Sequence, residues 1–330
     1  MREVIVVSTS YPEHAGDAQG HFVAAEVRRL CRDAHVTVLA PGRDRQPLGT
    51  ERVVSLGGGV AFGFPGALAR LRRAPWRAIA AARFVAAATR WLQQAWPPPQ
   101  QLVAHFLLPC GAPIATRGLT GDRTDLEVVV HGSDARLFAR LPAVARARLG
   151  ADLARARARL RFVSSELEHL VLSNVTPAQR ALLQPHARVE PCAVDVVGVP
   201  SRPRARALLG IADDARVAVI VARLVPGKRV DVALEACQRL AHLKTVVIGD
   251  GPERARLAAR FPRARFVGHV ERPLALTYLA AADALVSASR HEGAPSVVRE
   301  ARALGTPVVC LEAGDLRKWA KIDAGIHVVG

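Results

Sequence analysis

The chain has 330 residues, half of them hydrophobic, which is too long for one ordinary core and fits two α/β domains. Its net charge of +17, from 46 lysines and arginines against 29 acidic residues, would attract anionic partners such as nucleic acid, acidic lipid or phosphorylated substrates. The five scattered cysteines lack the paired spacing of a zinc site, so we expect reduced thiols and no bound metal.

Residues 1–190 are predicted to form an N-terminal Rossmann-like domain. The apolar run Val4–Val7 is too short for a secretory signal, and no apolar run is long enough to span a bilayer, so we expect a cytoplasmic protein. Valine-rich runs alternate with helical segments, which is typical of a parallel sheet built from βαβ units. We expect strands at approximately Val4–Ser8, Val36–Ala40, Val53–Leu56, Leu102–Phe106, Val128–His131 and Leu160–Ser164.

Two segments that follow strands of this half are candidate ligand sites. The loop after the first strand reaches Gly20 just before the first helix. It could cover phosphates there, and a plain connecting loop is an equally good interpretation. His131 ends a strand, and Gly132 after it lets the backbone approach a ligand closely. A lone histidine is more often structural, so both roles stay open for His131.

A basic and aromatic stretch over Leu68–Trp96 predicts a surface helix. Trp76, Arg83 and Arg90 are spaced seven apart, so a continuous helix would place them on one face that could rest on acidic lipid. The alternative is a solvated helix with core tryptophans. A nucleic-acid-binding protein would need stacking aromatics among its cations, and with two tyrosines and nine phenylalanines we expect no nucleic-acid partner. The stretch also contains Arg70, Arg72, Arg73, Arg77, Trp91 and Trp96.

Prolines interrupt the alternating pattern over residues 191–203, which we interpret as an interdomain linker before a C-terminal domain at 204–330. A second series of strands is expected there. Two doubly wound domains would face each other across a cleft, with a ligand at the carboxyl ends of both sheets. The expected strands are Val217–Ala222, Thr245–Ile248, Arg265–Val267, Ala284–Ser287 and Pro307–Cys310.

Two cations follow the first strand of this second series. Arg223 leaves the carboxyl end of the strand, and Lys228 begins the next helix five residues later. Both side chains can reach one diphosphate, whose negative charge grows when it departs as a leaving group. Lone cations after a strand are usually solvated, so this pair is a weak signal by itself.

A short helix bracketed by Pro295 and Gly305 is the strongest chemical signal of the chain. Proline suits the first helical position and glycine the position just past the end. The free backbone N–H groups near Ser296 and Val297 then form an anion site at the positive end of the helix. Glu292 lies in the loop before this helix and Glu300 lies on its second turn. Two carboxylates beside an anion site suit ribose and sugar hydroxyls, although two surface glutamates are the simpler alternative.

Taken in order, these segments resemble the retaining glycosyltransferase family 4, whose fold is called GT-B. The resemblance covers nearly the whole chain. Two departures are visible: the segment after Val309 lacks the usual Gly-Gly-x-Pro-Glu loop, and the sequence ends at Gly330, so the last helices of the family are expected to be truncated. The matching residues are His131 with Gly132 and Asp134, Pro191–Asp195, Arg223 with Lys228, Gly249–Pro252, and Glu292 with Glu300.

The resemblance implies a hexosyltransferase-type enzyme that needs no metal and no cofactor. It would move a sugar from a nucleoside-diphosphate sugar to a polysaccharide, lipid-linked glycan or small-molecule acceptor, and the anomeric configuration would be retained. Glu300 would bind the ribose, Arg223 and Lys228 the diphosphate, and Glu292 and His131 would lie beside the transferred sugar. The alternative is a sugar-nucleotide-binding module with little or no turnover. A basic surface would allow peripheral contact with the inner face of the cell membrane.

Overall fold

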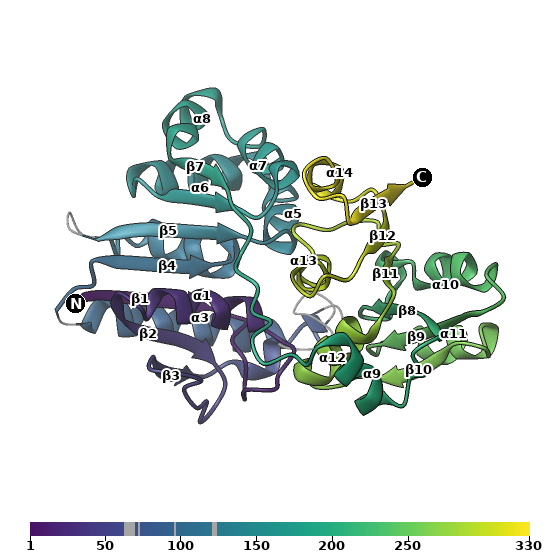
Figure 1. Cartoon of the computed structure of the whole chain (residues 1–330). Coiled ribbons are helices and arrows are strands. Elements are labelled where there is room, and N and C mark those ends of the chain that lie inside the picture. The colour runs from purple at the N-terminus through teal and green to yellow at the C-terminus, as the bar shows by residue number, and fades with distance from the viewer. Residues whose placement is uncertain (63–69, 72, 96, 121–123) are drawn as a thin grey trace. The chain divides into compact units, whose positions relative to one another are not determined.

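Valine- and isoleucine-rich runs form the strands of two parallel sheets, one in each of two structural units, Met1–Ala193 and Val194–Gly330 (Figure 1). The computed structural model describes residues 1–62, 70–71, 73–95, 97–120 and 124–330. The boundary between the units falls within the segment 191–203 that was interpreted as a linker.

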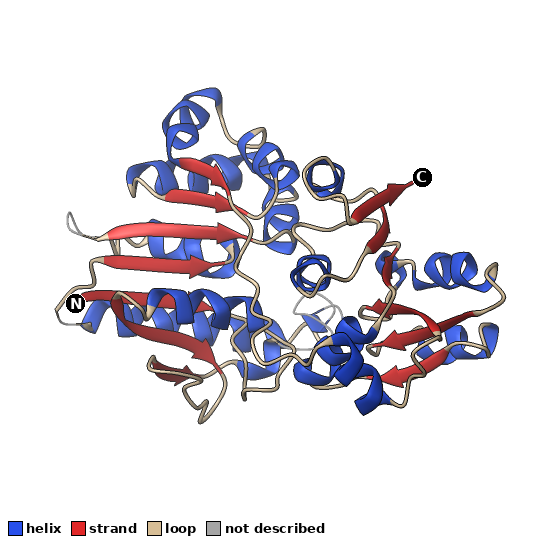
Figure 2. Ribbon diagram, in the orientation of Figure 1, coloured by secondary structure: helices blue, strands red, loops and turns tan. Residues whose placement is uncertain are grey.

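The N-terminal sheet has seven strands in the order β3-β2-β1-β4-β5-β6-β7, and every neighbouring pair is parallel. Helices connect the strands and pack beside them (Figure 2). The strands are β1 (Arg2–Ser8), β2 (Ala34–Pro41), β3 (Arg52–Leu56), β4 (Gln101–His105), β5 (Asp125–Val130), β6 (Arg159–Phe162) and β7 (Ala187–Val189). The α-helices are α1 (His21–Leu30), α3 (Arg77–Gln94), α4 (Ala112–Thr116), α5 (Ser133–Ala139), α6 (Ala143–Arg155), α7 (Ser165–Leu172) and α8 (Pro177–Leu183).

The C-terminal sheet has six strands in the order β10-β9-β8-β11-β12-β13, again all parallel. Its buried core combines Val, Leu and Ile of the central strands with apolar residues of the helices that pack on them. The strands are β8 (Arg216–Val221), β9 (Leu243–Ile248), β10 (Arg265–Gly268), β11 (Ala284–Ser287), β12 (Val308–Leu311) and β13 (Ile326–Val329). The α-helices are α9 (Arg202–Leu209), α10 (Val230–Gln238), α11 (Arg254–Arg260), α12 (Arg272–Ala281), α13 (Ser296–Ala303) and α14 (Leu316–Ala320).

Each of the eleven expected strands is present within a few residues of its predicted bounds, and the two that were missed, β7 and β13, are edge strands. β7 has three residues, none of them buried, so it lacks the apolar run that marks an interior strand. β13 has one buried residue, Ile326, in four.

The strand order reverses once in each sheet, between β1 and β4 in the first and between β8 and β11 in the second. In doubly wound sheets ligands bind outside the carboxyl ends of the strands at such a switch point. The loops after these four strands are therefore where a site is expected. Among the described residues, no helix has the length and apolar character needed to cross a bilayer.

Candidate active site

The loop after β8, which carries Arg223, is fastened to the turn after β9. The Leu224 N–H donates to the carbonyl of Asp250 at 2.9 Å, and the Glu253 N–H donates to the carbonyl of Leu224 at 3.1 Å. Gly249 has φ +125°, and a Cβ there would lie 1.9 Å from the carbonyl oxygen of Ala222. Only glycine permits this approach. The Gly-Asp-Gly-Pro turn therefore fixes the loop and leaves Arg223 exposed beyond the strand end.

Lys228 and Glu292 come together at the switch point of the C-terminal sheet. Lys228 ends a 3-10 turn after β8, Glu292 lies in the loop after β11, and Lys228 Nζ lies 2.5 Å from Glu292 Oε1. The Arg290 N–H donates to the Gly227 carbonyl at 3.0 Å, which joins the two loops through their backbones. The side chains are 21% and 14% exposed, so the pair remains within reach of a ligand.

The helix α13 begins beside this pair. Pro295 precedes the helix with an extended ψ of 111°, so the prediction that it is the first helical residue is wrong by one position. Ser296 and Val297 are partly exposed on the first turn, where backbone N–H groups lack helical partners. Gly305, with φ +79°, follows the last turn as expected.

Glu300 lies on the buried side of α13 and is 6% exposed. It forms an ion pair with Arg272 at the start of α12, with 2.7 Å between Arg272 Nη2 and Glu300 Oε1. The same guanidinium nitrogen donates to the carbonyl of Asp195. Sequence reasoning missed Arg272, because an isolated arginine at a helix start belongs to no recognisable motif.

The segment after β12, where the resemblance failed, supports the backbone of Glu292. Gly314 has φ +55°, and a Cβ there would lie 2.6 Å from the carbonyl oxygen of Gly293 and 2.8 Å from that of Glu292. Gly314 thus approaches the Glu292 loop so closely that a side chain would not fit between them. A different sequence here still positions the acid.

In the N-terminal unit, His131 follows β5 and makes a hydrogen bond with His105 at the end of β4. His105 Nδ1 and His131 Nε2 are 3.0 Å apart. The rings of Phe22 and Phe106 flank His131 at centroid distances of 4.9 and 4.6 Å. Burial, with the nearby Arg161 charge, lowers the pKa of His105 to about 3, and burial together with His105 lowers that of His131. Both rings are therefore neutral at physiological pH.

The carboxylate of Asp134 fixes the backbone of both histidine loops. Its Oδ1 accepts the N–H groups of His131 and Gly132 at 3.1 and 2.8 Å, and its Oδ2 accepts the Leu107 N–H at 2.7 Å. Asp134 is 2% exposed, and burial raises its pKa while these three donors oppose the rise. The Asp of the His-Gly-x-Asp element is thus a structural clamp.

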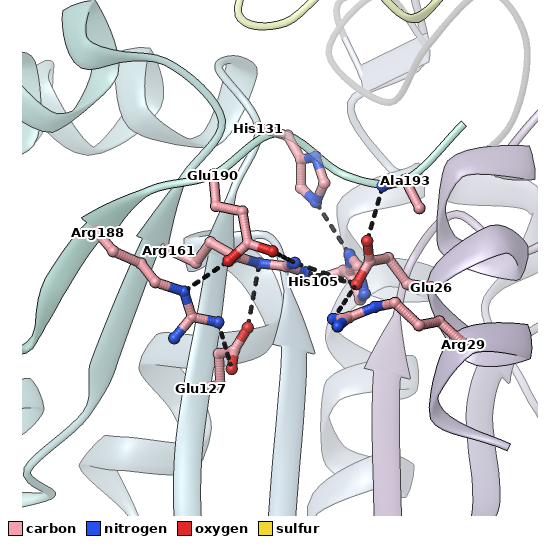
Figure 3. A network of polar contacts seen from close by, with 9 residues as sticks. All are labelled: Glu26, Arg29, His105, Glu127, His131, Arg161, Arg188, Glu190 and Ala193. Atoms are coloured by element: carbon pink, nitrogen blue, oxygen red, sulfur yellow. Dashed lines mark hydrogen bonds and ion pairs between the residues drawn. The ribbon is translucent and has the colours of Figure 1, made fainter. Parts of the chain in front are cut away.

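Beside His105, a buried ion network surrounds Arg161 (Figure 3). The guanidinium contacts Glu26 Oε2 at 3.1 Å through both terminal nitrogens, and its Nε lies 3.1 Å from Glu127 Oε1. The other oxygen of Glu26 accepts the Ala193 N–H at 2.7 Å, at the boundary of the unit. The network therefore ties β6, α1 and the end of the unit together. Arg29, Arg188 and Glu190 complete it.

One group within the described residues has the donor atoms for a metal ion: His105, His131 and Cys192, whose ligand atoms all lie within 4.8 Å of one another. A divalent cation there would lie near the buried Arg161, whose charge already opposes protonation of both imidazoles. Glu26 acts in the opposite direction and raises the pKa of His131, and Arg161 is itself paired with Glu26 and Glu127. The expectation that no metal is bound stays a prediction.

Gly20 precedes α1 with φ +71°, and a Cβ there would lie 2.6 Å from the carbonyl oxygen of Ser10. This glycine lets the loop after β1 fold back on itself before the helix starts. A direct contact between Gly20 and a ligand stays a prediction, as do the ligand contacts of His131, Glu292 and Glu300.

The geometry can be compared with known proteins. A family model described as glycosyl transferases group 1 matches residues 215–328, most of the second unit and the part that holds Arg223, Lys228, Glu292 and Glu300. Residues 215–328 of the C-terminal unit are thus similar to the group 1 glycosyltransferases. The resemblance predicted from the sequence motifs is therefore confirmed.

Two curated glycosyltransferases illustrate the relation. The GDP-mannose-dependent alpha-mannosyltransferase of Mycobacterium tuberculosis is 40% identical over 98 residues, which are 29% of this chain and 25% of the relative. The D-inositol 3-phosphate glycosyltransferase of Mycobacterium leprae is 32% identical over 175 residues, which are 47% of this chain and 40% of the relative. The matched segments thus span less than half of these glycosyltransferases.

Solved glycosyltransferase structures match both units. Sucrose-phosphate synthase from Thermosynechococcus elongatus has a TM-score of 0.73 at 17% identity and covers 99% of this chain and 86% of its own. Anabaena HepE in complex with UDP and glucose has a TM-score of 0.65 at 17% identity, covering 96% and 83%. The predicted fold of two Rossmann-like domains, GT-B, is therefore confirmed.

Proposed function

We propose that the protein is a hexosyltransferase that moves a sugar from a nucleoside-diphosphate sugar to an acceptor with retention of configuration. The observation that carries this proposal is the arrangement at the β8–β11 switch point. Exposed Arg223 and the Lys228–Glu292 pair lie in loops at the same strand ends as the N-terminus of α13. The relatives agree in ligand class, since one is named GDP-mannose-dependent and HepE has been solved with UDP-glucose.

The diphosphate is the group that this arrangement suits best. Arg223, Lys228 and the N–H groups of Ser296 and Val297 supply positive charge where negative charge grows as the glycosidic bond breaks. We infer that these groups neutralise the leaving diphosphate without a metal ion or a cofactor. Lys228 is hydrogen-bonded to Glu292, and we infer that the donor diphosphate would draw the ammonium toward phosphate and release Glu292 for the sugar hydroxyls.

Glu300 would bind the ribose hydroxyls of the donor. The ion pair with Arg272, with 2.7 Å between Arg272 Nη2 and Glu300 Oε1, would hold this carboxylate in place beside the ribose. His131 would contact the transferred sugar, and an acceptor hydroxyl would lose its proton to the donor phosphate on the same face. No protein nucleophile is needed in this scheme.

A thermal-shift panel of UDP, GDP and ADP with their glucose or mannose conjugates tests the proposal, since a ligand that binds the folded state raises the melting temperature. Lys228→Ala should weaken diphosphate affinity about tenfold or more through loss of a charge-assisted contact. Lys244→Ala is the matched control, because Lys244 is exposed near the amino end of β9. Equal affinity of both variants, or no shift with any nucleotide, would refute the proposal. Binding without transfer to any acceptor would identify a sugar-nucleotide-binding module.

We further propose that the acceptor is a glycan, a lipid-linked glycan or a small molecule reached at the inner face of the cell membrane. The supporting observation is an exposed stripe formed by Trp76, directly before α3, and by Ile79, Arg83 and Arg90 on this helix. Trp76 and Ile79 are each 62% exposed, and the two arginines follow on the same face. Apolar tips beside cations suit an anionic lipid surface. Leu68, Arg72 and Trp96 of the predicted stretch lie outside the described residues.

Co-sedimentation with vesicles tests this contact. Replacing Arg83 and Arg90 together by glutamate should abolish salt-sensitive binding to vesicles that contain phosphatidylglycerol. Arg216→Glu is the control, because Arg216 is an exposed arginine at the start of β8 in the other unit. If the wild-type protein does not co-sediment with anionic vesicles at low salt, the membrane proposal is refuted, whereas the donor proposal is unaffected.

A further inference from the structure

His105 is a buried histidine that the proposed chemistry does not use. It is 0% exposed at the end of β4, where its backbone pairs with that of Ser8 at the end of β1. These are the two strands between which the order of the N-terminal sheet reverses. A fully buried imidazole is unusual at the point of a doubly wound sheet where ligands bind. Its partner is His131.

The hydrogen bond between the rings can be drawn with the proton on either histidine. If His131 Nε2 carries the proton, neutral His105 must carry its own on Nε2. If His105 Nδ1 carries it, His105 Nε2 is bare and neutral His131 must be protonated on Nδ1. Each arrangement therefore fixes the tautomers of both rings.

The buried surroundings of His105 Nε2 distinguish the two arrangements. Within the part of the chain that the structure describes, this atom has no hydrogen-bond partner and no solvent exposure. An orphaned buried N–H is rarer in proteins than an acceptor left without a donor. The arrangement with a bare Nε2 on His105 is thus favoured, and His105 is then the donor to His131.

The surrounding backbone holds the two rings in this relation. Asp134 accepts N–H groups from Leu107, two residues after His105, and from His131 itself. Between them, Phe106 has φ +78°, a conformation that a bulky side chain adopts only when its surroundings enforce it. Its ring packs on His131. Strain and a buried clamp at one point indicate that the ring geometry is specified.

We propose that His105 is a positioning residue that holds His131 in the neutral Nδ1–H tautomer, so that His131 offers a hydrogen-bond donor and never an imidazolium to its ligand. A neutral donor suits the oxygen atoms of a sugar. An imidazolium would instead repel the positive charge that develops on the sugar ring as the diphosphate departs. This consequence for the ligand rests on the proposed function, whereas the tautomer itself does not.

Proton–nitrogen correlation spectra of labelled imidazoles in the full-length protein test the proposal directly. At about pH 7, His105 and His131 should both appear as Nδ1–H tautomers, and neither should titrate down to about pH 5. A His131 ring protonated on Nε2, or one that titrates with an ordinary histidine pKa, would overturn the proposal. So would a stoichiometric metal ion in the purified protein, because the two rings would then be its ligands.

Two substitutions separate positioning from packing. His105→Asn keeps a donor close to the Nδ1 position and should preserve the Nδ1–H tautomer of His131. His105→Phe removes the donor, so the His131 ring should no longer be restricted to this tautomer. Gln101→Leu, at the other buried end of β4, is the control and should change nothing. An unchanged His131 spectrum in His105→Phe would overturn the proposal. If His105→Phe fails to fold, the spectra of the wild type and of His105→Asn still test the proposal, because both should show His131 as the Nδ1–H tautomer.

Affinity measurements connect the tautomer to the donor. In His105→Phe, affinity for UDP should be unchanged, and affinity for UDP-glucose, or for whichever sugar conjugate the panel selects, should fall about tenfold. Equal losses for both would mean that His105 does not act through the sugar. A protein that binds no nucleotide would fail the function proposed above while the tautomer result stands.

Discussion

Replacing Arg161 by methionine tests whether the buried network stabilises the N-terminal unit. The change removes a guanidinium that is 1% exposed and keeps a side chain of similar length. It leaves Glu26 and Glu127, 5% and 8% exposed, without their buried cation. Breaking a buried ion pair from one side costs about 3–5 kcal/mol, because a charge remains in the interior without compensation.

The lower end of this range applies here. Glu26 keeps the Ala193 N–H and Arg29, and Glu127 keeps Arg188. Both remaining arginines are about half exposed, so water screens their charges and each contributes little. We expect a loss of about 3 kcal/mol in the free energy of unfolding of this unit, a large part of the usual total of about 5–15 kcal/mol.

The decrease in the free energy of unfolding caused by Arg161→Met should depend on pH. Burial raises the pKa of Glu26, but Arg161, the Ala193 N–H and Arg29 outweigh burial and hold it below its usual range. A lowered folded-state pKa stabilises the protein above the unfolded value of about 4.3, and the stabilisation is lost as pH falls through the folded value. In Arg161→Met the carboxyl can protonate more easily. The difference in the free energy of unfolding between wild type and Arg161→Met should therefore become smaller as the pH falls from about 7 to about 4.

Urea unfolding followed by tryptophan fluorescence measures this loss. In a Trp319→Phe background all remaining tryptophans belong to the N-terminal unit, so the signal reports that unit. Arg159→Met is the control, because Arg159 lies two residues away on β6 and pairs with Asp125 while both are well exposed. It should cost at most about 1 kcal/mol. Equal losses in both variants would show that the burial argument is wrong.

Three further outcomes are expected. Gly249→Ala should lower the melting temperature by several degrees, because its Cβ would meet the Ala222 carbonyl at 1.9 Å, whereas Gly227→Ala has open space and should not; similar melting of both would contradict the contact. Gly314→Ala should lower kcat/KM for sugar transfer by displacing the Glu292 loop. Gly210→Ala is the control for backbone strain, because Gly210 has a similar φ and a Cβ there would contact no atom within 4 Å. Cys310 should resist iodoacetamide at about pH 8, since burial raises its pKa to about 11, and mass spectrometry that finds it alkylated as fast as the partly exposed Cys31 would refute this.

The interior of the fold was predictable because buried parallel strands leave continuous apolar runs. β8 and β9 are examples. Val217–Ile220 and Thr245–Ile248 lie in strands that were predicted from the sequence, and all of these residues are buried in the structure. The residues after such strands could also be assigned to a site, since strand ends define the place where ligands bind. Arg223 and Lys228 were predicted in this way, and their contacts with a ligand stay predictions.

The partners of Glu300 and His131 could not be predicted, because they come from distant segments of the sequence. Arg272 pairs with Glu300 from another helix, and His105 meets His131 from the neighbouring strand. Neither pairing leaves a spacing pattern in the sequence. The buried arginine Arg161 resembled the other charged residues of an arginine-rich chain, and only its 1% exposure distinguishes it.

The hydrogen bond from Ala193 to Glu26 has a practical consequence for protein engineering. Chimeras that combine the first unit of this chain with the second unit of a relative need a crossover point. A junction placed after residue 193 would preserve this bond, whereas a proline at position 193 would deprive a buried carboxylate of its backbone donor. The residue at position 193 of such a chimera should therefore be any residue except proline.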